Sequence, residues 1–297
     1  MQPKTARIGA VGLGGESVFL TADHFHAPGE TLCAESIFNE PGGKAYNQAV
    51  AAARLGAQVC FFGAVGSDPG GALCRDVLLR EGVTPILQPV PEANTAYACI
   101  LTDRRGENQV TVYRGAADLL SADFLRAQEA ALSRCTHLLL GLECPLDATK
   151  AALAIAKKHG IFTILNPAPA IPLEPDFLRS FDLITPNQQE AAVLLGLNYT
   201  PEPSELADRL RAARLTNAVV TLGSRGSLLV TPKGCSSPPF PSPPWTPPVP
   251  GIPSMQPSPS PSAAASPYRK PWNLPPTPPP GASPAVTSWT LSPPQTS

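Results

Sequence analysis

Short apolar runs that end at a glycine or a polar residue recur through the first 234 residues and predict buried β-strands. They cover residues 7–12, 58–65, 137–142, 162–165, 182–185, 218–222 and 227–231. Between them, apolar residues three to five positions apart predict helices at residues 45–55, 72–82, 147–159, 188–195 and 204–213. Strands that alternate with helices favour a parallel sheet with helices on both faces, so we expect an α/β fold.

Two more apolar runs, residues 97–102 and 108–113, are joined by the polar turn 103–107 and predict a β-hairpin. Their alternation is weak, which suits strands that cover something rather than fill a core. Ligands of a parallel sheet bind outside the carboxyl ends of its strands. The loops expected at that edge are polar, and they contain Glu143, Asn166, residues 187–190 and residues 221–226.

The stretch Asn39–Ala49 places two glycines, a lysine and an asparagine before a helix of small residues. Gly42 and Gly43 allow a backbone to approach closely, and the helix start offers unpaired N–H groups and the positive end of a dipole. Such a place suits a polar or anionic small molecule. The alternative is a plain glycine turn that closes on an alanine-rich helix.

The net charge is -1, the sequence pI is near 6.4 and Lys and Arg form no clustered run, so nothing indicates a nucleic-acid partner. No apolar run approaches the roughly 18 residues of a membrane span, and the N-terminus enters a strand without a leader pattern. The seven cysteines are scattered and form no C-x-x-C pair, so neither a disulfide framework nor a zinc site is indicated. We therefore expect no membrane partner and a reducing cytoplasm.

Seven motifs in order give the chain a resemblance to the ribokinase family, the phosphofructokinase-B type of carbohydrate kinases, over about residues 7–233. They are residues 28–31 (PGET), 42–49 (GGKAYNQA), 63–68 (GAVGSD), 142–146 (LECPL), 166–169 (NPAP), 185–190 (TPNQQE) and 221–226 (TLGSRG). The resemblance implies a three-layer α/β/α sandwich with a small β-sheet lid, built from a strand near residues 31–38 and the hairpin 96–113. A lid excludes water from phosphoryl transfer.

The resemblance also implies site residues for a sugar, for ATP and for Mg²⁺. The sugar would lie against Gly42, Gly43, Lys44, Asn47 and Glu143. The nucleotide would lie near Asn187, Thr221, Gly223, Ser224 and Gly226, and Glu190 would hold Mg²⁺ through water. The family resemblance leaves room for a monovalent cation and for a homodimer formed through the lid.

Each of these residues has a plainer structural interpretation. Glu143 could be a helix-start acid favoured by the dipole, and Asn187 could be an N-cap. Gly223 and Gly226 could be hairpin glycines. Taken singly, the two interpretations are about even; the order of the motifs favours the functional one.

Two departures from the family pattern concern the substrate and the metal. Gly15 and Ser17 stand where ribokinases carry an Asn and an Asp that hold sugar hydroxyls, which puts ribose itself in doubt. The alternative is that Glu16, a neighbouring carboxylate, compensates for the lost acceptors. Gln188 stands where the family usually has Glu, which removes one charge near the metal and leaves Glu190.

The composition changes near Gly234. Of the 38 prolines, 22 follow Gly234, and residues 235–297 contain neither Asp nor Glu. The family's Asp-Thr-x-Gly-Ala-Gly-Asp element, whose backbone N–H groups stabilise the phosphoryl charge and whose last Asp takes the hydroxyl proton, does not occur. We therefore divide the chain into a kinase domain at 1–234, incomplete at its C-terminus, and a disordered Pro/Ser-rich tail at 235–297.

The codons of residues 245–255, read one base earlier, can spell Val-Asp-Thr-Thr-Gly-Ala-Gly-Asp-Thr-Phe-Asn. This favours the hypothesis that the tail is a frameshifted translation of the missing kinase C-terminus. The rival is a natural polyproline segment that binds SH3-type partners. The sequence thus predicts an ATP- and Mg²⁺-dependent kinase of a sugar hydroxymethyl group that is impaired in this chain, or a catalytically dead sugar-binding or Pro-motif interaction protein.

Overall fold

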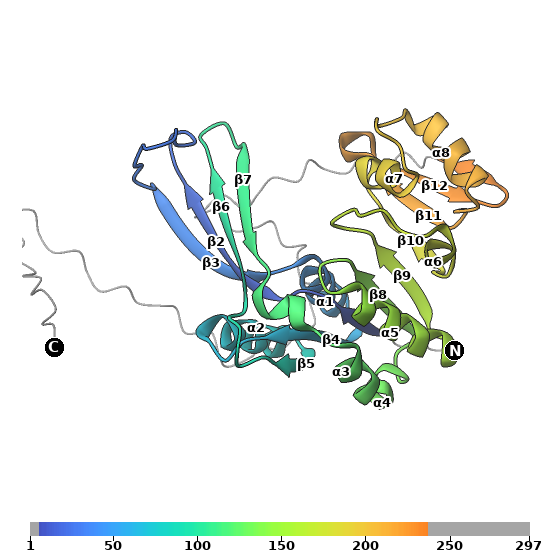
Figure 1. The fold of residues 1–297 in the computed structure, drawn as a ribbon, viewed down its shortest axis with the longest axis horizontal. Helices are drawn as coiled ribbons and strands as arrows, with labels where there is room; N and C mark the ends of the chain where they lie inside the picture. Colours follow the sequence, from blue (N-terminus) through green and yellow to red (C-terminus); the bar gives the residue numbers. More distant parts are fainter. Residues whose placement is uncertain (1–5, 237–297) are drawn as a thin grey trace, which may run out of the picture. The chain divides into compact units, whose positions relative to one another are not determined.

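The computed structural model describes residues 6–236, which form two β-sheets with helices packed on the larger one (Figure 1). The strands of the larger sheet are β1 (Arg7–Val11), β4 (Gln58–Val65), β5 (Val83–Pro89), β8 (His137–Gly141), β9 (Phe162–Asn166), β10 (Leu183–Ile184), β11 (Ala218–Thr221), β12 (Ser227–Thr231) and β13 (Gly234–Ser236). Within the described residues their order is β13-β12-β11-β10-β9-β8-β1-β4-β5, and all pairs from β5 to β11 are parallel. The predicted α/β class is confirmed.

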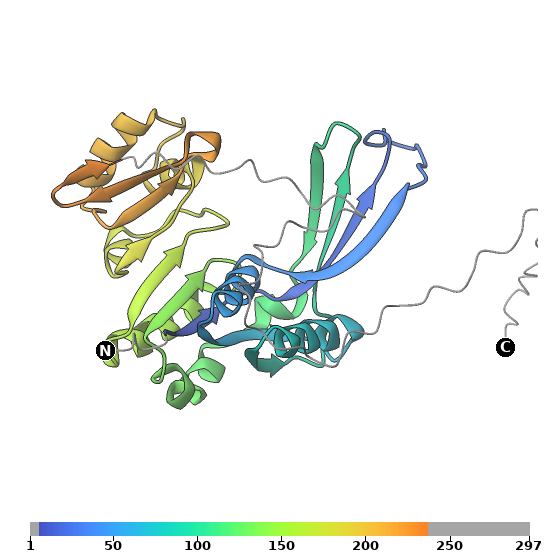
Figure 2. The ribbon, with the colours of Figure 1, turned by 180° about the vertical axis from the view of Figure 1, so that it is seen from behind.

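Helices cover both faces of this sheet (Figures 1 and 2). The helical segments are α1 (Lys44–Arg54), α2 (Pro69–Arg80), η1 (Gly115–Leu119), α3 (Ala122–Ala127), α4 (Glu129–Leu132), α5 (Leu146–Lys158), α6 (Pro175–Arg179), α7 (Gln188–Leu194), α8 (Pro203–Ala212) and η2 (Gly223–Arg225). Successive strand residues point to opposite faces. Ala10 and Phe61 therefore pack in the core under α1 and α2, whereas Val11 and Phe62 pack in the core on the α5 side.

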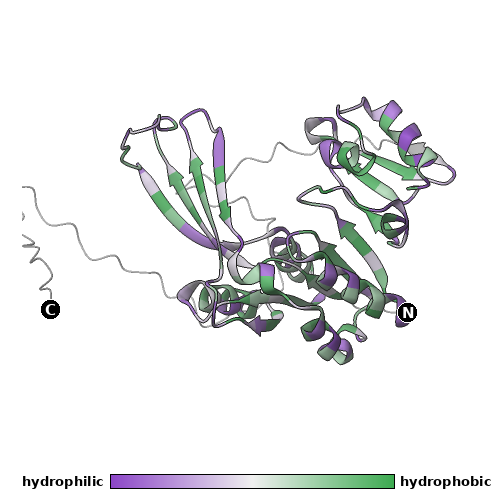
Figure 3. Cartoon of the chain, viewed as in Figure 1, coloured by the Kyte–Doolittle hydropathy of each residue, from purple (hydrophilic) through white to green (hydrophobic). Residues whose placement is uncertain are grey.

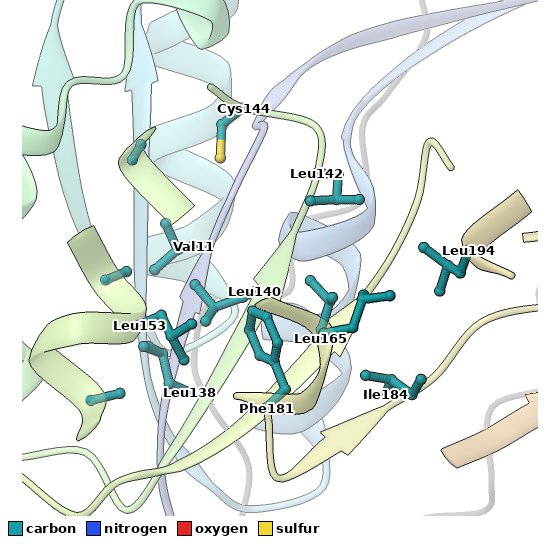
Figure 4. Packing of buried hydrophobic residues seen from close by; sticks show 14 of the residues in the cluster. Val11, Leu138, Leu140, Leu142, Cys144, Leu153, Leu165, Phe181, Ile184 and Leu194 are labelled. Carbon is teal, nitrogen blue, oxygen red and sulfur yellow. The ribbon is translucent and has the colours of Figure 1, made fainter. Parts of the chain in front are cut away.

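The larger core lies on the α5 side of the sheet and is filled by aliphatic side chains (Figure 4). Leu138, Leu140 and Leu165 are fully buried there, and β8 and β9, which carry them, are coloured mostly hydrophobic in Figure 3. Burial of one such side chain stabilises the fold by about 1.5–3 kcal/mol. Towards the other end of the sheet burial alternates, since Val220 is buried while Val219 is half-buried.

The second sheet is the lid, and it has four strands in the order β3-β2-β6-β7. They are β2 (Gly15–Thr21), β3 (Ser36–Gly42), β6 (Ala96–Thr102) and β7 (Asn108–Tyr113). The predicted hairpin 96–113 is confirmed as β6 and β7. Its turn is held by the buried Asp103, whose Oδ1 accepts from Arg105 N and Glu107 N at 2.9 and 3.0 Å.

The predicted lid strand at residues 31–38 is misplaced, because residues 31–35 are not in a strand and β3 begins at Ser36. β2, the strand between β3 and β6, was missed altogether. β2 pairs along its full length with β3, and the Phe19 and Phe38 rings stack with centroids 4.4 Å apart. This long-range pairing fixes the strand boundaries, whereas the apolar pattern of residues 31–38 alone does not.

The structure also adds strands at both edges of the large sheet. β5 contains Pro85 and Pro89 and was not predicted as a strand. It is an edge strand that pairs with β4 alone among the described residues, so prolines are tolerated there. β13 pairs with β12 and extends two residues past the predicted boundary at Gly234. The rest of the predicted tail lies outside the described residues.

Candidate active site

A cavity of about 240 Å³ lies between the lid and the start of α1, beside the carboxyl ends of β1 and β8. These strands are neighbours in the sheet, and the chain leaves them in opposite directions, through α1 to β4 and through α5 to β9. A crevice is expected at such a switch point. The cavity brings together all five residues predicted for sugar binding, namely Gly42, Gly43, Lys44, Asn47 and Glu143.

Gly43 is required by the backbone at the start of α1. Its φ of 124° lies in a region that side chains rarely adopt, and an added Cβ would lie 2.2 Å from the carbonyl oxygen of Leu13. α1 therefore begins without a side-chain cap of its own. Its first N–H groups need a partner from elsewhere.

Glu143 supplies that partner. Its Oε2 accepts a hydrogen bond of 2.7 Å from the backbone N–H of Lys44. Burial raises the pKa of the Glu143 carboxyl, while the Lys44 N–H and the charges of Lys44 and Arg114 act in the opposite direction. Glu143 therefore does act at a helix start, as the plainer interpretation expected, but the helix is α1 rather than the adjoining α5. The carboxylate is therefore engaged by the start of α1.

Arg114 is a neighbour of Glu143 that the sequence analysis missed. Its Nη2 donates to the Glu143 carbonyl oxygen at 3.0 Å, and its Nε lies 2.6 Å from Asp118 Oδ1. The residue follows β7, so the lid hairpin delivers a positive charge to the site. No motif marks this arginine in the sequence, because its contact is with a residue 29 positions further along the chain.

Asn187 and Glu190, predicted for the nucleotide and the metal, form a capping box at the start of α7. Asn187 Oδ1 accepts from Glu190 N at 2.7 Å, and Glu190 Oε2 accepts from Asn187 N at 2.8 Å. Glu190 Oε1 lies 4.0 Å from Lys44 Nζ. This ion pair connects the cavity predicted to bind the sugar with the side predicted to bind the nucleotide.

The remaining nucleotide-side residues are Thr221, Gly223, Ser224 and Gly226, and they lie beside Asn187. Thr221 forms a parallel bridge with Asn187, and residues 223–225 form η2. Leu222 N donates to Gly226 O at 2.8 Å, which closes a tight loop. These residues do not line the sugar cavity.

Gln188 has a use that the sequence analysis did not foresee. Its Nε2 donates to the carbonyl oxygen of Pro201 at 2.6 Å, and its Oε1 accepts from Arg225 Nη2 at 2.7 Å. A carboxylate could accept from Arg225 but could not donate to Pro201. The departure from Glu therefore anchors η2 to the loop that precedes α8.

A divalent cation would find one carboxylate here. Among the described residues, no group of three or more His, Cys, Asp or Glu side chains is arranged to hold a metal. Glu190 is partly buried, and one of its oxygens is engaged by Asn187. This donor set fits Mg²⁺, which keeps several waters and binds through one or two carboxylates and substrate phosphates.

Residues 17–245 match the model of the pfkB family of carbohydrate kinases. The chain belongs to this family. The family member from Haemophilus influenzae named ribokinase is 37% identical over 220 residues, which are 73% of this chain and 72% of that protein. This pfkB protein is a carbohydrate kinase of the ribokinase type, from a family that uses ATP.

Solved ribokinases share the fold of this pfkB protein. The structure from Thermotoga maritima has a TM-score of 0.67 and 29% identity and covers 80% of this chain and 78% of its own. The structure from Cryptococcus neoformans var. grubii in complex with ADP has a TM-score of 0.62 and 28% identity, with 78% of each chain covered. None of the described helices is long and apolar enough to cross a membrane.

Proposed function

We propose that this carbohydrate kinase descends from enzymes that phosphorylate a hydroxymethyl group of ribose or a related sugar. The cavity under the lid is the observation that carries the proposal. It combines the start of α1, Lys44, Asn47 and Glu143 with an apolar cover. Sites for small molecules typically place a few polar groups in a mostly apolar wall. The name of the Haemophilus relative supports ribose as the reference sugar.

ATP would bind on the side of Asn187, Thr221, Gly223, Ser224 and Gly226. The ion pair between Lys44 and Glu190 lies between this side and the cavity, which supports a role for both residues at the transferred phosphoryl group. Glu190 would hold Mg²⁺ through water. When bound, Mg²⁺ supplies charge neutralisation at the phosphates.

This chain should phosphorylate poorly, because the described residues offer no free carboxylate at the cavity to act as the general base. The two carboxylates at the cavity are both engaged, Glu16 by Asn39 Nδ2 at 2.8 Å and Glu143 by Lys44 N. Residues 235–297 contain no Asp or Glu. A frameshift near Gly234, which separates a kinase domain at 1–234 from the tail, would account for the missing acidic residues.

The test compares the 297-residue chain with a chain whose reading frame is restored after Gly234. ADP release is measured with D-ribose and related sugars, and the source DNA is resequenced across the codons for Gly226 to Met255. We expect turnover from the restored chain alone. Sugar-dependent ADP release by the 297-residue chain would refute the impairment.

Three other results bear on the proposal. An unaltered DNA sequence would refute the frameshift. A restored chain that neither turns over nor binds any sugar would refute the kinase assignment. A sugar-dependent thermal shift without turnover in both chains would favour a catalytically dead sugar-binding protein.

A further inference from the structure

The lid presents almost no polar side chain to the sugar cavity. The lid residues on the cavity side are Ala96, Ala98, Ile100, Val110 and Val112. Val110 and Val112 are each 54% exposed, so this side of the lid presents uncovered apolar surface. A sugar hydroxyl that faced this wall would lose water without gaining a hydrogen bond.

Glu16 and Tyr97 also border the cavity, but their side chains belong to the opposite face of the lid. Glu16 pairs with Tyr97 across β2 and β6, and the next pair along the strands is Ser17 with Ala98. Because successive residues point to opposite faces, Glu16 and Tyr97 lie on the face opposite Ser17 and Ala98. Glu16 Oε1 accepts from Asn39 Nδ2 at 2.8 Å, and Glu16 Oε2 lies 3.5 Å from an ideal Cβ on Gly70 of α2. Glu16 is therefore held away from the cavity and does not compensate for the missing acceptors.

Gly15 cannot be exchanged for a polar residue without moving the lid. A Cβ on Gly15 would lie 2.5 Å from the carbonyl oxygen of Ala96 and 2.8 Å from its Cβ. Contacts under 3.0 Å with backbone force a shift. The close parallel pairing of β2 with β6 thus fixes a glycine there.

Ser17 remains as the polar side chain that the lid offers to the cavity. Its hydroxyl has no hydrogen-bond partner among residues 6–236, and it lies 2.8 Å from an ideal Cβ on Gly42. A serine hydroxyl donates one hydrogen bond, whereas a carboxylate can accept from two neighbouring hydroxyls at once. The lid side can therefore serve one sugar hydroxyl but not a vicinal pair.

We propose that Ser17 determines specificity and that the cavity prefers a monodeoxy pentose, such as 2-deoxy-D-ribose, to the fully hydroxylated sugar. This inference rests on the proposed function, since it takes the cavity to be a sugar site. Ribose carries a vicinal 2,3-diol; with that edge of the sugar against the lid, Ser17 would pair with one of the two hydroxyls and the apolar strands with neither. 2-Deoxyribose carries one hydroxyl there, so Ser17 satisfies it.

Isothermal titration of the 297-residue chain with 2-deoxy-D-ribose and D-ribose, without nucleotide, tests the preference. We expect 2-deoxyribose to bind about tenfold more tightly, which is the scale of one unpaired buried hydroxyl. The ratio of two affinities from one preparation does not depend on the folded fraction. Ribose binding as tightly as 2-deoxyribose, or more tightly, would overturn the inference and leave the proposed function intact.

Two variants assign the preference to Ser17. Ser17→Asp supplies two acceptor oxygens and should shift the ratio towards ribose, whereas Ser17→Ala should weaken both sugars. Thr111→Ala, on the outward face of β7, is the matched control and should leave the ratio unchanged. Variants with unaltered ratios and affinities would overturn the role of Ser17. Failure of every sugar to bind the parent chain would instead refute the proposed function.

Discussion

Glu143 joins two parts of the fold that are far apart in the sequence, and its removal should show what that connection contributes. Its carboxylate caps α1, which has no cap of its own because Gly43 precedes it. A lost helix cap costs about 0.5–2 kcal/mol, and the loss of one or two partly buried methylenes adds about 1 kcal/mol. We therefore expect Glu143→Ala to lower the free energy of unfolding by about 2 kcal/mol.

Glu143→Gln is the matched variant, because the amide oxygen can still accept from Lys44 N. Burial is the main reason why the pKa of Glu143 is raised above its ordinary value of 4.5. The folded state therefore holds this proton more tightly than the unfolded state. The contribution of the group to stability is full below pH 4.5 and is lost as the pH rises through the folded-state pKa. Glu143→Gln should remove this pH-dependent loss of stability, because the amide does not ionise.

Urea unfolding of the three proteins at pH 4 and pH 7 is the assay. With an m-value of about 3 kcal/mol/M, the expected 2 kcal/mol lowers the midpoint of Glu143→Ala by about 0.7 M. Glu143→Gln should match the parent at pH 4 and equal or exceed it at pH 7. Equal midpoints for the Ala and Gln variants would refute the capping role, because only the Gln variant retains an acceptor.

Three further predictions test single contacts. Gly43→Ala should lower the melting temperature far more than Gly56→Ala, since both have positive φ but only Gly43 faces the Leu13 carbonyl; similar thermal melts would contradict this. Burial raises the pKa of Asp182, but hydrogen bonds from Thr163 and the charge of Lys157 outweigh it, so the pKa is lowered overall. The Asp182 carboxylate therefore stabilises the fold above pH 3.8, and this stabilisation is lost as the pH falls through the folded-state pKa. Asp182→Asn should thus cost about 1–2 kcal/mol in urea unfolding at pH 7 and little at pH 2, and a pH-independent cost would be evidence against this. Gln188→Glu would place a carboxylate oxygen against the Pro201 carbonyl oxygen, so it should weaken binding of a fluorescent ATP analogue about three- to tenfold and leave sugar affinity unchanged. Unchanged nucleotide affinity would show that the Arg225 contact does not position η2.

Local patterns in the sequence sufficed for much of the fold. The buried runs predicted the strands at residues 58–65 and 137–142 because both faces of a parallel strand are covered and its residues are apolar without alternation. The helix at α1 followed from Gly43 and the small residues after it. The motifs also picked out the five residues predicted to bind the sugar, which the structure gathers in one cavity.

The tertiary structure decided what depends on partners distant in the chain. β2 is a strand because β3 and β6 pair with it, and β5 accepts two prolines because it is an edge strand. Glu143 caps a helix 99 residues away, a contact for which local periodicity carries no signal.

Arg114 and Gln188 gain their roles in the same way, through contacts with the loop after β8 and with η2. Local propensity and hydrophobic period report on a residue's neighbours within a few positions. The chemistry of this site depends on which strand ends and helix starts the two sheets bring together. The sequence by itself therefore determined most helices and strands of the large sheet and the family pattern, and the packing of the lid on that sheet decided which side chains face the cavity.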